Sequence, residues 1–183
     1  ARGTALQLAT LSPTANSTIK IPPGVYALGD NQIVIPDDVA LVGSGIGATK
    51  ITSTRGITTS VIINPGDRAY LANFTVEAVA AEIQMPIGID ETTGDTGATG
   101  IIIENVKMIG DYDGFYVYHD NQVVEAILRN CIMETKYDAV AITTAASSIV
   151  HRVDLYNCRI VIAGPSASGL GVSRGMTSQK DTI

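Results

Sequence analysis

The feature that most constrains the fold of this chain is a six-residue segment that recurs four times around an asparagine. The copies span residues 71–76, 103–108, 128–133 and 155–160, and their asparagines are Asn73, Asn105, Asn130 and Asn157. Successive asparagines are 32, 25 and 27 residues apart. Such a recurring period indicates a stacked repeat architecture. It leaves too little chain for a β–α–β unit with a full helix, and no 3.6-residue periodicity lies between the copies.

Within each copy the side chains alternate between apolar and polar. The apolar pairs that follow the asparagines are Phe74/Val76, Val106/Met108, Cys131/Met133 and Cys158/Ile160. A second alternating run accompanies each copy, at residues 87–89, 115–117, 140–142 and 170–172. A period of two is typical of strands, whose side chains point to opposite faces in turn. Two such strands and a third short one close a coil. The sequence therefore predicts an all-β, right-handed parallel β-helix of about six coils.

The asparagine has two physical reasons to recur at one place in each coil. It tolerates the left-handed backbone of a sharp bend, and its amide can hydrogen bond to the amide one coil above. The same spacing places Asp113 next to Asp138, about 4.8 Å away if the coils are in register. We interpret these two carboxylates first as turn residues, with a catalytic pair as the alternative. Glu104 is expected beneath Arg129 and Tyr156 in a surface ladder.

The N-terminal third carries shorter predicted strands, each bounded by Pro, Gly or Asp. They lie within residues 18–28, 33–45, 49–52 and 60–63. Residues 1–17 are expected to form an N-terminal capping segment, with one or two helical turns around residues 4–11. Such a cap keeps the end of a stack from pairing with other sheet edges. Residues 18–183 are then the parallel β-helix domain.

Composition narrows the functions that this chain can perform. The net charge is −6 with a pI near 4.7, and Lys and Arg do not cluster as they do in nucleic-acid-binding sites. The apolar stretches fall short of the roughly 20 residues that span a bilayer, and no signal peptide is recognisable. Cys131 and Cys158 lack metal-ligand spacing and are interpreted as buried free thiols, with a functional pair as the alternative. We therefore expect no nucleic-acid partner, membrane insertion, metal or cofactor.

Residues 21–26 (Ile-Pro-Pro-Gly-Val-Tyr), with residues 33–35 and 39–45, resemble the entry to the pectate-lyase-like β-helices of phage tailspikes and of polysaccharide lyases and hydrolases. The asparagine-anchored coils are similar to the repeat of that superfamily, and the resemblance covers about residues 18–172. It implies a partner that is a cell-surface or extracellular polysaccharide, a homotrimer, and a location in a virion tail or outside the cell.

The same resemblance carries over no catalytic residues. The chain lacks the Asn-Thr-Asp, Gly-His-Gly and Arg-Ile-Lys sets that polygalacturonases carry. It also lacks a set of calcium-binding aspartates with a partnering arginine, as found in pectate lyases. The resemblance therefore assigns no catalytic residues to this chain.

A strip of outward positions along the second strand of the later coils, continued into the turn that follows, is our candidate carbohydrate-binding surface. Its residues are Asp90, Glu91, Tyr116, Tyr118, His119, Asp120 and Arg174. Aromatic rings can stack on sugars and carboxylates can accept hydrogen bonds from sugar hydroxyls, and the alternative is an ordinary exposed strand. Asp90, Asp120 and His119 are weak catalytic candidates, because glycoside hydrolysis needs carboxylates about 5 to 9.5 Å apart. A second polar cluster, His151, Arg152 and Asp154, is interpreted as decorating a turn.

Two functions of different classes follow. The first is a tailspike-like structural and receptor-binding domain that contacts cell-surface polysaccharide. The alternative is a polysaccharide lyase or glycoside hydrolase that acts on an acidic or capsular polysaccharide, with its site completed by a neighbouring subunit. The coil near the end of the sequence has no evident cap, so we expect either further chain or another subunit to cover it.

Overall fold

The computed structural model describes residues 5–6, 13–54, 60–79, 84–90, 98–119, 122–143 and 151–162. They form fifteen strands, β1 to β15, and a helical turn at Ala5 and Leu6. Leu6 packs into the hydrophobic core at 4% exposure. Within these ranges, no helix has the length and apolar character needed to cross a membrane.

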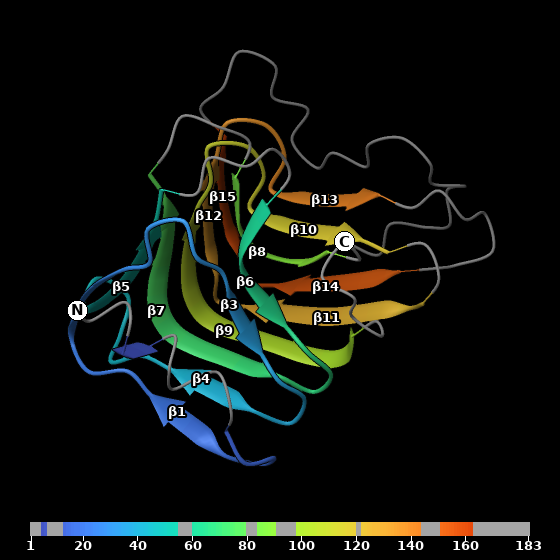
Figure 1. Ribbon diagram of the computed structural model, residues 1–183. Coiled ribbons are helices and arrows are strands. Elements are labelled where there is room, and N and C mark those ends of the chain that lie inside the picture. Colours follow the sequence, from blue (N-terminus) through green and yellow to red (C-terminus); the bar gives the residue numbers. More distant parts are fainter. Residues whose placement is uncertain are drawn as a thin grey trace.

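The strands lie on three faces, and on each face every strand pairs in parallel with its equivalent in the next coil (Figure 1). The first face holds β1 (Thr18–Lys20), β4 (Ala40–Val42), the first part of β7 (Tyr70–Ala78), the first part of β9 (Ala98–Ile109), β11 (Val124–Arg129) and β14 (Arg152–Tyr156). The second face holds β2 (Gly24–Ala27), β5 (Thr49–Ser53), the later parts of β7 and β9, β12 (Ile132–Thr135) and β15 (Arg159–Ile162).

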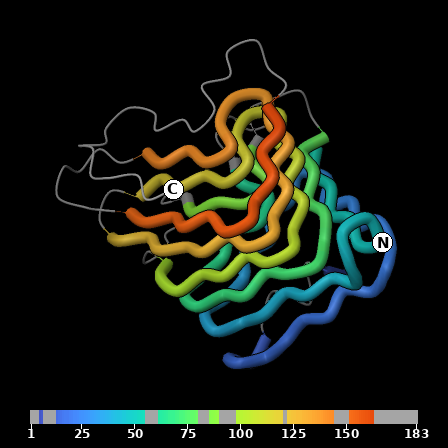
Figure 2. The backbone as a smooth tube through the Cα atoms, turned by 180° about the vertical axis from the view of Figure 1, so that it is seen from behind, coloured from blue at the N-terminus to red at the C-terminus, as the bar shows by residue number. Residues whose placement is uncertain are grey.

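The third face is a separate sheet of five strands. It holds β3 (Ile33–Ile35), β6 (Ser60–Pro65), β8 (Gln84–Asp90), β10 (Phe115–Tyr118) and β13 (Val140–Thr143). Figure 2 shows the coils from behind, stacked from blue at the N-terminal end to red. The predicted parallel β-helix is confirmed. The number of complete coils is slightly below the predicted six, because β14 and β15 have no third-face strand among the described residues.

The core is a column of inward side chains, as the alternation predicted. Six members of the inward pairs are at most 1% exposed: Phe74, Val76, Val106, Met108, Cys131 and Met133. The fourth pair differs, since Cys158 is half-buried and Ile160 is 37% exposed. Both lie in the last described coil, whose strands pair within the described residues only with the coil before them.

The corner between the first and second faces is built on the predicted asparagines. All four adopt left-handed backbone, with φ between 51° at Asn157 and 63° at Asn73. The amide of Asn105 donates to Asn73 Oδ1 at 2.7 Å, and that of Asn157 donates to Asn130 Oδ1 at 2.7 Å. One coil earlier the same place is taken by Gly43. A Cβ atom there would lie 2.3 Å from the backbone oxygen of Asn73, so only glycine fits.

A second left-handed column stands at the corner where the third face leads into the first. Its members are Asn16, Asp38, Arg68 and Gly100, with φ of 62°, 59°, 55° and 70°. A left-handed arginine is strained, and a bidentate pair with Asp38, at 2.6 and 2.8 Å, holds Arg68 in place. Because four different residue types occupy this column, no recurring residue marks it in the sequence.

Replacing Asn105 separates the two roles of the corner asparagine. Asn105→Gly keeps the left-handed backbone but loses the amide hydrogen bond, so we expect its free energy of unfolding to fall by about 1 kcal/mol. Asn105→Ala also incurs the left-handed penalty, so we expect about 2 kcal/mol. Urea unfolding of both variants measures the difference. Equal losses in the two variants would show that backbone strain plays no part at this corner.

Candidate functional site: the outer surface of the third face

Two tyrosines dominate the described outer surface of β10. Phe115 and Val117 point inward and are fully buried, whereas Tyr116 and Tyr118 point outward and are partly exposed. The two tyrosine rings are nearly parallel, at 14°, with centroids 6.5 Å apart. This spacing is close to the rise of two residues along a strand, about 6.8 Å. The strand itself therefore sets the distance between the rings.

Small residues flank the first ring on both sides. Tyr116 is paired in register with Gly88 of β8 and with Ala141 of β13. A Cβ atom at Gly88 would lie 2.5 Å from the backbone oxygen of Tyr116, so glycine permits the close approach of the two strands. Tyr118 is paired with Asp90 and Thr143. The predicted runs 87–89 and 115–117 are thus in register, and Asp90 lies next to Tyr118.

Only some residues of the candidate strip lie within the described part of the chain. Tyr116, Tyr118 and the backbone of Asp90 lie side by side on the third face. The side chain of Asp90 is not described. Glu91, Asp120 and Arg174 lie outside the described residues.

His119, the remaining member, is turned into the protein and is only 2% exposed. Its Nδ1 accepts a hydrogen bond from the backbone N–H of Gln122 at 3.1 Å. His151, in the next coil, makes an equivalent hydrogen bond. His151 Nδ1 accepts from the N–H of Val124 at 3.1 Å, so the proton is on Nε2, which donates to the His119 carbonyl at 2.9 Å. Both histidines thus hold the corner between the third and first faces.

The turns that lead into β10 and β13 carry further interacting side chains outside the predicted sets. The rings of Tyr112 and Tyr137 meet with centroids 4.5 Å apart. Lys136 forms an ion pair with Asp111 across the same two coils. Tyr112 and Tyr137 each lie seven residues past their corner asparagine. The arithmetic that aligned Asp113 with Asp138 would therefore have aligned these tyrosines as well.

Asp113 and Asp138 are neighbours, as predicted, and both are buried, at 2% and 8% exposure. The Asp138 N–H donates to Asp113 Oδ1 at 3.2 Å, and the Gly114 N–H donates to the Asp138 carbonyl at 2.9 Å. Burial is the main cause that raises the pKa of Asp113 to about 7, and the charge of Asp138 adds to it. These bonds fit the interpretation as turn residues.

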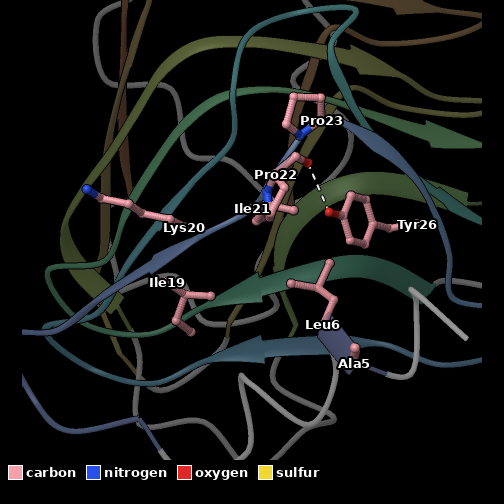
Figure 3. Close-up of a pocket in the computed structure, with 8 residues that line it drawn as sticks. All are labelled: Ala5, Leu6, Ile19, Lys20, Ile21, Pro22, Pro23 and Tyr26. Carbon is pink, nitrogen blue, oxygen red and sulfur yellow. Dashed lines mark hydrogen bonds between the residues drawn. The ribbon is translucent and has the colours of Figure 1, made fainter.

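Two pockets lie away from the third-face tyrosines. One, of about 290 Å³, is at the corner between the second and third faces and is lined by Ala78, Ile109, Gly110, Asp111, Glu134, Thr135, Lys136 and Val161. The other, of about 400 Å³, is under the N-terminal helical turn. Figure 3 shows its apolar lining around Leu6, Ile19 and Tyr26, whose hydroxyl donates to the Pro22 carbonyl at 2.9 Å. This lining suits a capping contact better than a sugar site.

Several solved structures have a fold similar to that of this chain. A pectin methylesterase in complex with a hexasaccharide matches with a TM-score of 0.63 and 14% identity, over 86% of this chain and 50% of that one. A mutant pectin methylesterase with another hexasaccharide matches with a TM-score of 0.52 and 12% identity, over 82% and 61%. The fold is that of the parallel β-helix proteins.

The A-module of an Azotobacter vinelandii mannuronan C-5 epimerase also matches, over 85% of this chain and 51% of that one, with 16% identity and a TM-score of 0.46. This chain therefore spans about half to three fifths of the length of the structures it matches. No protein-family model matches the sequence, and no curated protein does.

The contact between β8 and β10 yields a stability prediction. Gly88→Ala places a methyl group against the backbone of Tyr116, and overpacking of this kind costs about 2 kcal/mol. Val34→Ala, at an exposed outward position on the same face, is the control and should change stability by less than about 0.5 kcal/mol. Thermal and urea unfolding measure both. An unchanged Gly88→Ala protein would contradict the close approach.

Asp113 yields a prediction about pH. Its pKa is raised in the folded state, so between about pH 4 and pH 7 the folded protein holds a proton that the unfolded chain has lost, and stability falls as pH rises. Asp113→Asn can still accept the Asp138 N–H but does not titrate. As pH rises from 4 to 8, the free energy of unfolding of the variant should therefore increase by roughly 3 kcal/mol relative to that of the wild type. Parallel pH profiles of the two proteins would contradict the raised pKa.

Proposed function

We propose that this chain is a polysaccharide-binding β-helix domain, with the outer surface of the third face around Tyr116 and Tyr118 as its binding surface. The observation that carries the proposal is the pair of nearly parallel, partly exposed tyrosine rings, 6.5 Å apart on one strand. A pyranose ring presents C–H groups on its faces, and these groups pack well on aromatic rings. Tyrosine also offers a hydroxyl that can hydrogen bond to sugar hydroxyls.

The residues paired with the two tyrosines have short side chains. Gly88 and Ala141 flank Tyr116, so no long side chain from the paired strands crosses the strip at this point. Thr143, next to Tyr118, adds a hydroxyl that can donate and accept. The neighbouring outward residues Asn64, Gly88 and Ala141 are buried, so the exposed surface around the rings is made by Tyr116, Tyr118 and Thr143.

The proposal includes a tailspike-like role in receptor binding. A receptor-binding domain of this kind acts as a homotrimer, in a virion tail or outside the cell, and contacts the polysaccharide of a cell surface. The sequence supports this assignment through its entry segment at residues 21–26 and through the missing catalytic sets of the related enzymes. Analytical ultracentrifugation tests the assembly, and a stable monomer at micromolar concentration would count against it.

Binding to polysaccharides tests the surface. We expect the chain to bind at least one member of a panel of neutral, acidic and capsular bacterial polysaccharides. Changing both Tyr116 and Tyr118 to Ala should weaken that binding at least tenfold, because the aromatic surface is removed. Isothermal titration calorimetry measures the affinity. Tyr156→Ala is the matched control, because Tyr156 is 52% exposed but lies on the first face.

The outcomes separate the alternatives. Unchanged binding by the double variant would remove the third-face surface from consideration, and the absence of binding across the panel would contradict the proposed function. The thermal midpoint of the double variant should fall no further than that of the control. Release of reducing ends or of unsaturated uronates from a bound polysaccharide would instead establish the alternative, a hydrolase or a lyase.

A further inference from the structure

Cys131 and Cys158 occupy equivalent places in two successive coils. Each follows the asparagine of its corner, and those asparagines are joined by the 2.7 Å amide hydrogen bond between Asn157 and Asn130. The residues on both sides are in register: Arg129 pairs with Tyr156, and Ile132 pairs with Arg159. The N–H of Arg159 also donates to the carbonyl of Cys131 at 2.8 Å. One cysteine therefore lies directly over the other.

This placement meets the geometric requirement for a disulfide. Neighbouring in-register strands are about 4.8 Å apart, which is inside the range of roughly 4.4 to 6.8 Å between the Cα atoms of bonded cysteines. Both side chains belong to the inward column, where Cys131 is 1% exposed and Cys158 packs against the core. The two thiols lie close enough to influence each other's ionisation. Both are free in this structure.

The structure points to Cys131 and Cys158 as an oxidisable pair that forms a disulfide between successive coils when the protein meets a small-molecule disulfide. Cys158 is the more exposed of the two and attacks first, as its thiolate. Its sulfur bonds to one sulfur of the oxidant and releases the other as a small thiolate. Cys131 then attacks the sulfur of Cys158 and displaces the second small thiol, and the proton of Cys131 passes to that leaving group. Two protein thiols are oxidised and one small disulfide is reduced.

The electrostatics of the pair support this order of events. The interaction with the Cys158 thiol, followed by burial, raises the pKa of the Cys131 thiol. The same interaction lowers the pKa of the Cys158 thiol, because it stabilises the thiolate. Each sulfur also approaches a carbonyl of the preceding coil, Cys131 with Ile103 at 3.5 Å and Cys158 with Leu128 at 3.4 Å. These contacts hold both side chains on the same side of the corner.

The bond would join the coil of β14 and β15 to the coil before it. Within the described residues this last coil pairs on one side only, and Tyr156 and Ile160 are 52% and 37% exposed. Strands with few buried contacts open before the rest of a protein. A covalent link at Cys158 would therefore resist the separation of the last described coil from the coil before it.

Oxidation of the purified chain with oxidised glutathione tests the inference. We expect intact-mass analysis to show the loss of two hydrogens and peptide mapping to recover a Cys131–Cys158 link that dithiothreitol reverses. Amide hydrogen exchange in residues 152–162 should slow at least tenfold after oxidation. A wild-type protein that retains glutathione on Cys158, or that reacts at neither cysteine, would overturn the inference.

Two serine variants provide the controls. Cys131→Ser should accumulate the mixed disulfide on Cys158, because the second attack is lost. Cys158→Ser should remain unreactive, because Cys131 is buried. Should either variant fail to fold, trapping the wild-type thiols with iodoacetamide before and after oxidation gives the same answer. Disulfide-linked dimers in place of the internal link would contradict the stacking of the two thiols.

Discussion

The structure depends on one constraint, which is that successive coils pair in register. Parallel hydrogen bonding places each residue over its equivalent in the previous coil, so like side chains meet along the whole stack. The amide pairs at the first corner, the neighbouring Asp113 and Asp138, and the two stacked cysteines are all results of this single arrangement. Each of these contacts joins residues 25 to 32 positions apart in the sequence.

Much of this could be predicted because the repeat is visible in the sequence. The period, the inward pairs and the alignment of Tyr116 with Gly88 all follow from alternation and spacing. The second left-handed column could not be found in this way. Its positions need only a backbone that can adopt positive φ, and Asn16, Asp38, Arg68 and Gly100 meet that need by different means. Because several residue types can adopt positive φ, no single residue type recurs at these positions.

The candidate site was predicted less completely than the fold. Alternation correctly placed Tyr116 and Tyr118 outside, because both lie within a regular strand. It could not place His119, which follows the strand and turns inward to accept the N–H of Gln122. Beyond the end of a strand, the direction of a side chain is decided by local hydrogen bonds. The period of two no longer applies there.

The three corners differ in how much variation they accept. The strands β7 and β9 run unbroken through the asparagine corner, so the first two faces form one bent sheet with no room for extra residues. Where the third face leads into the first, five residues separate β10 from β11 and eight separate β13 from β14. Evolutionary insertions are therefore best tolerated beside the tyrosine surface. New ligand preferences could arise there while the asparagine corner keeps its geometry.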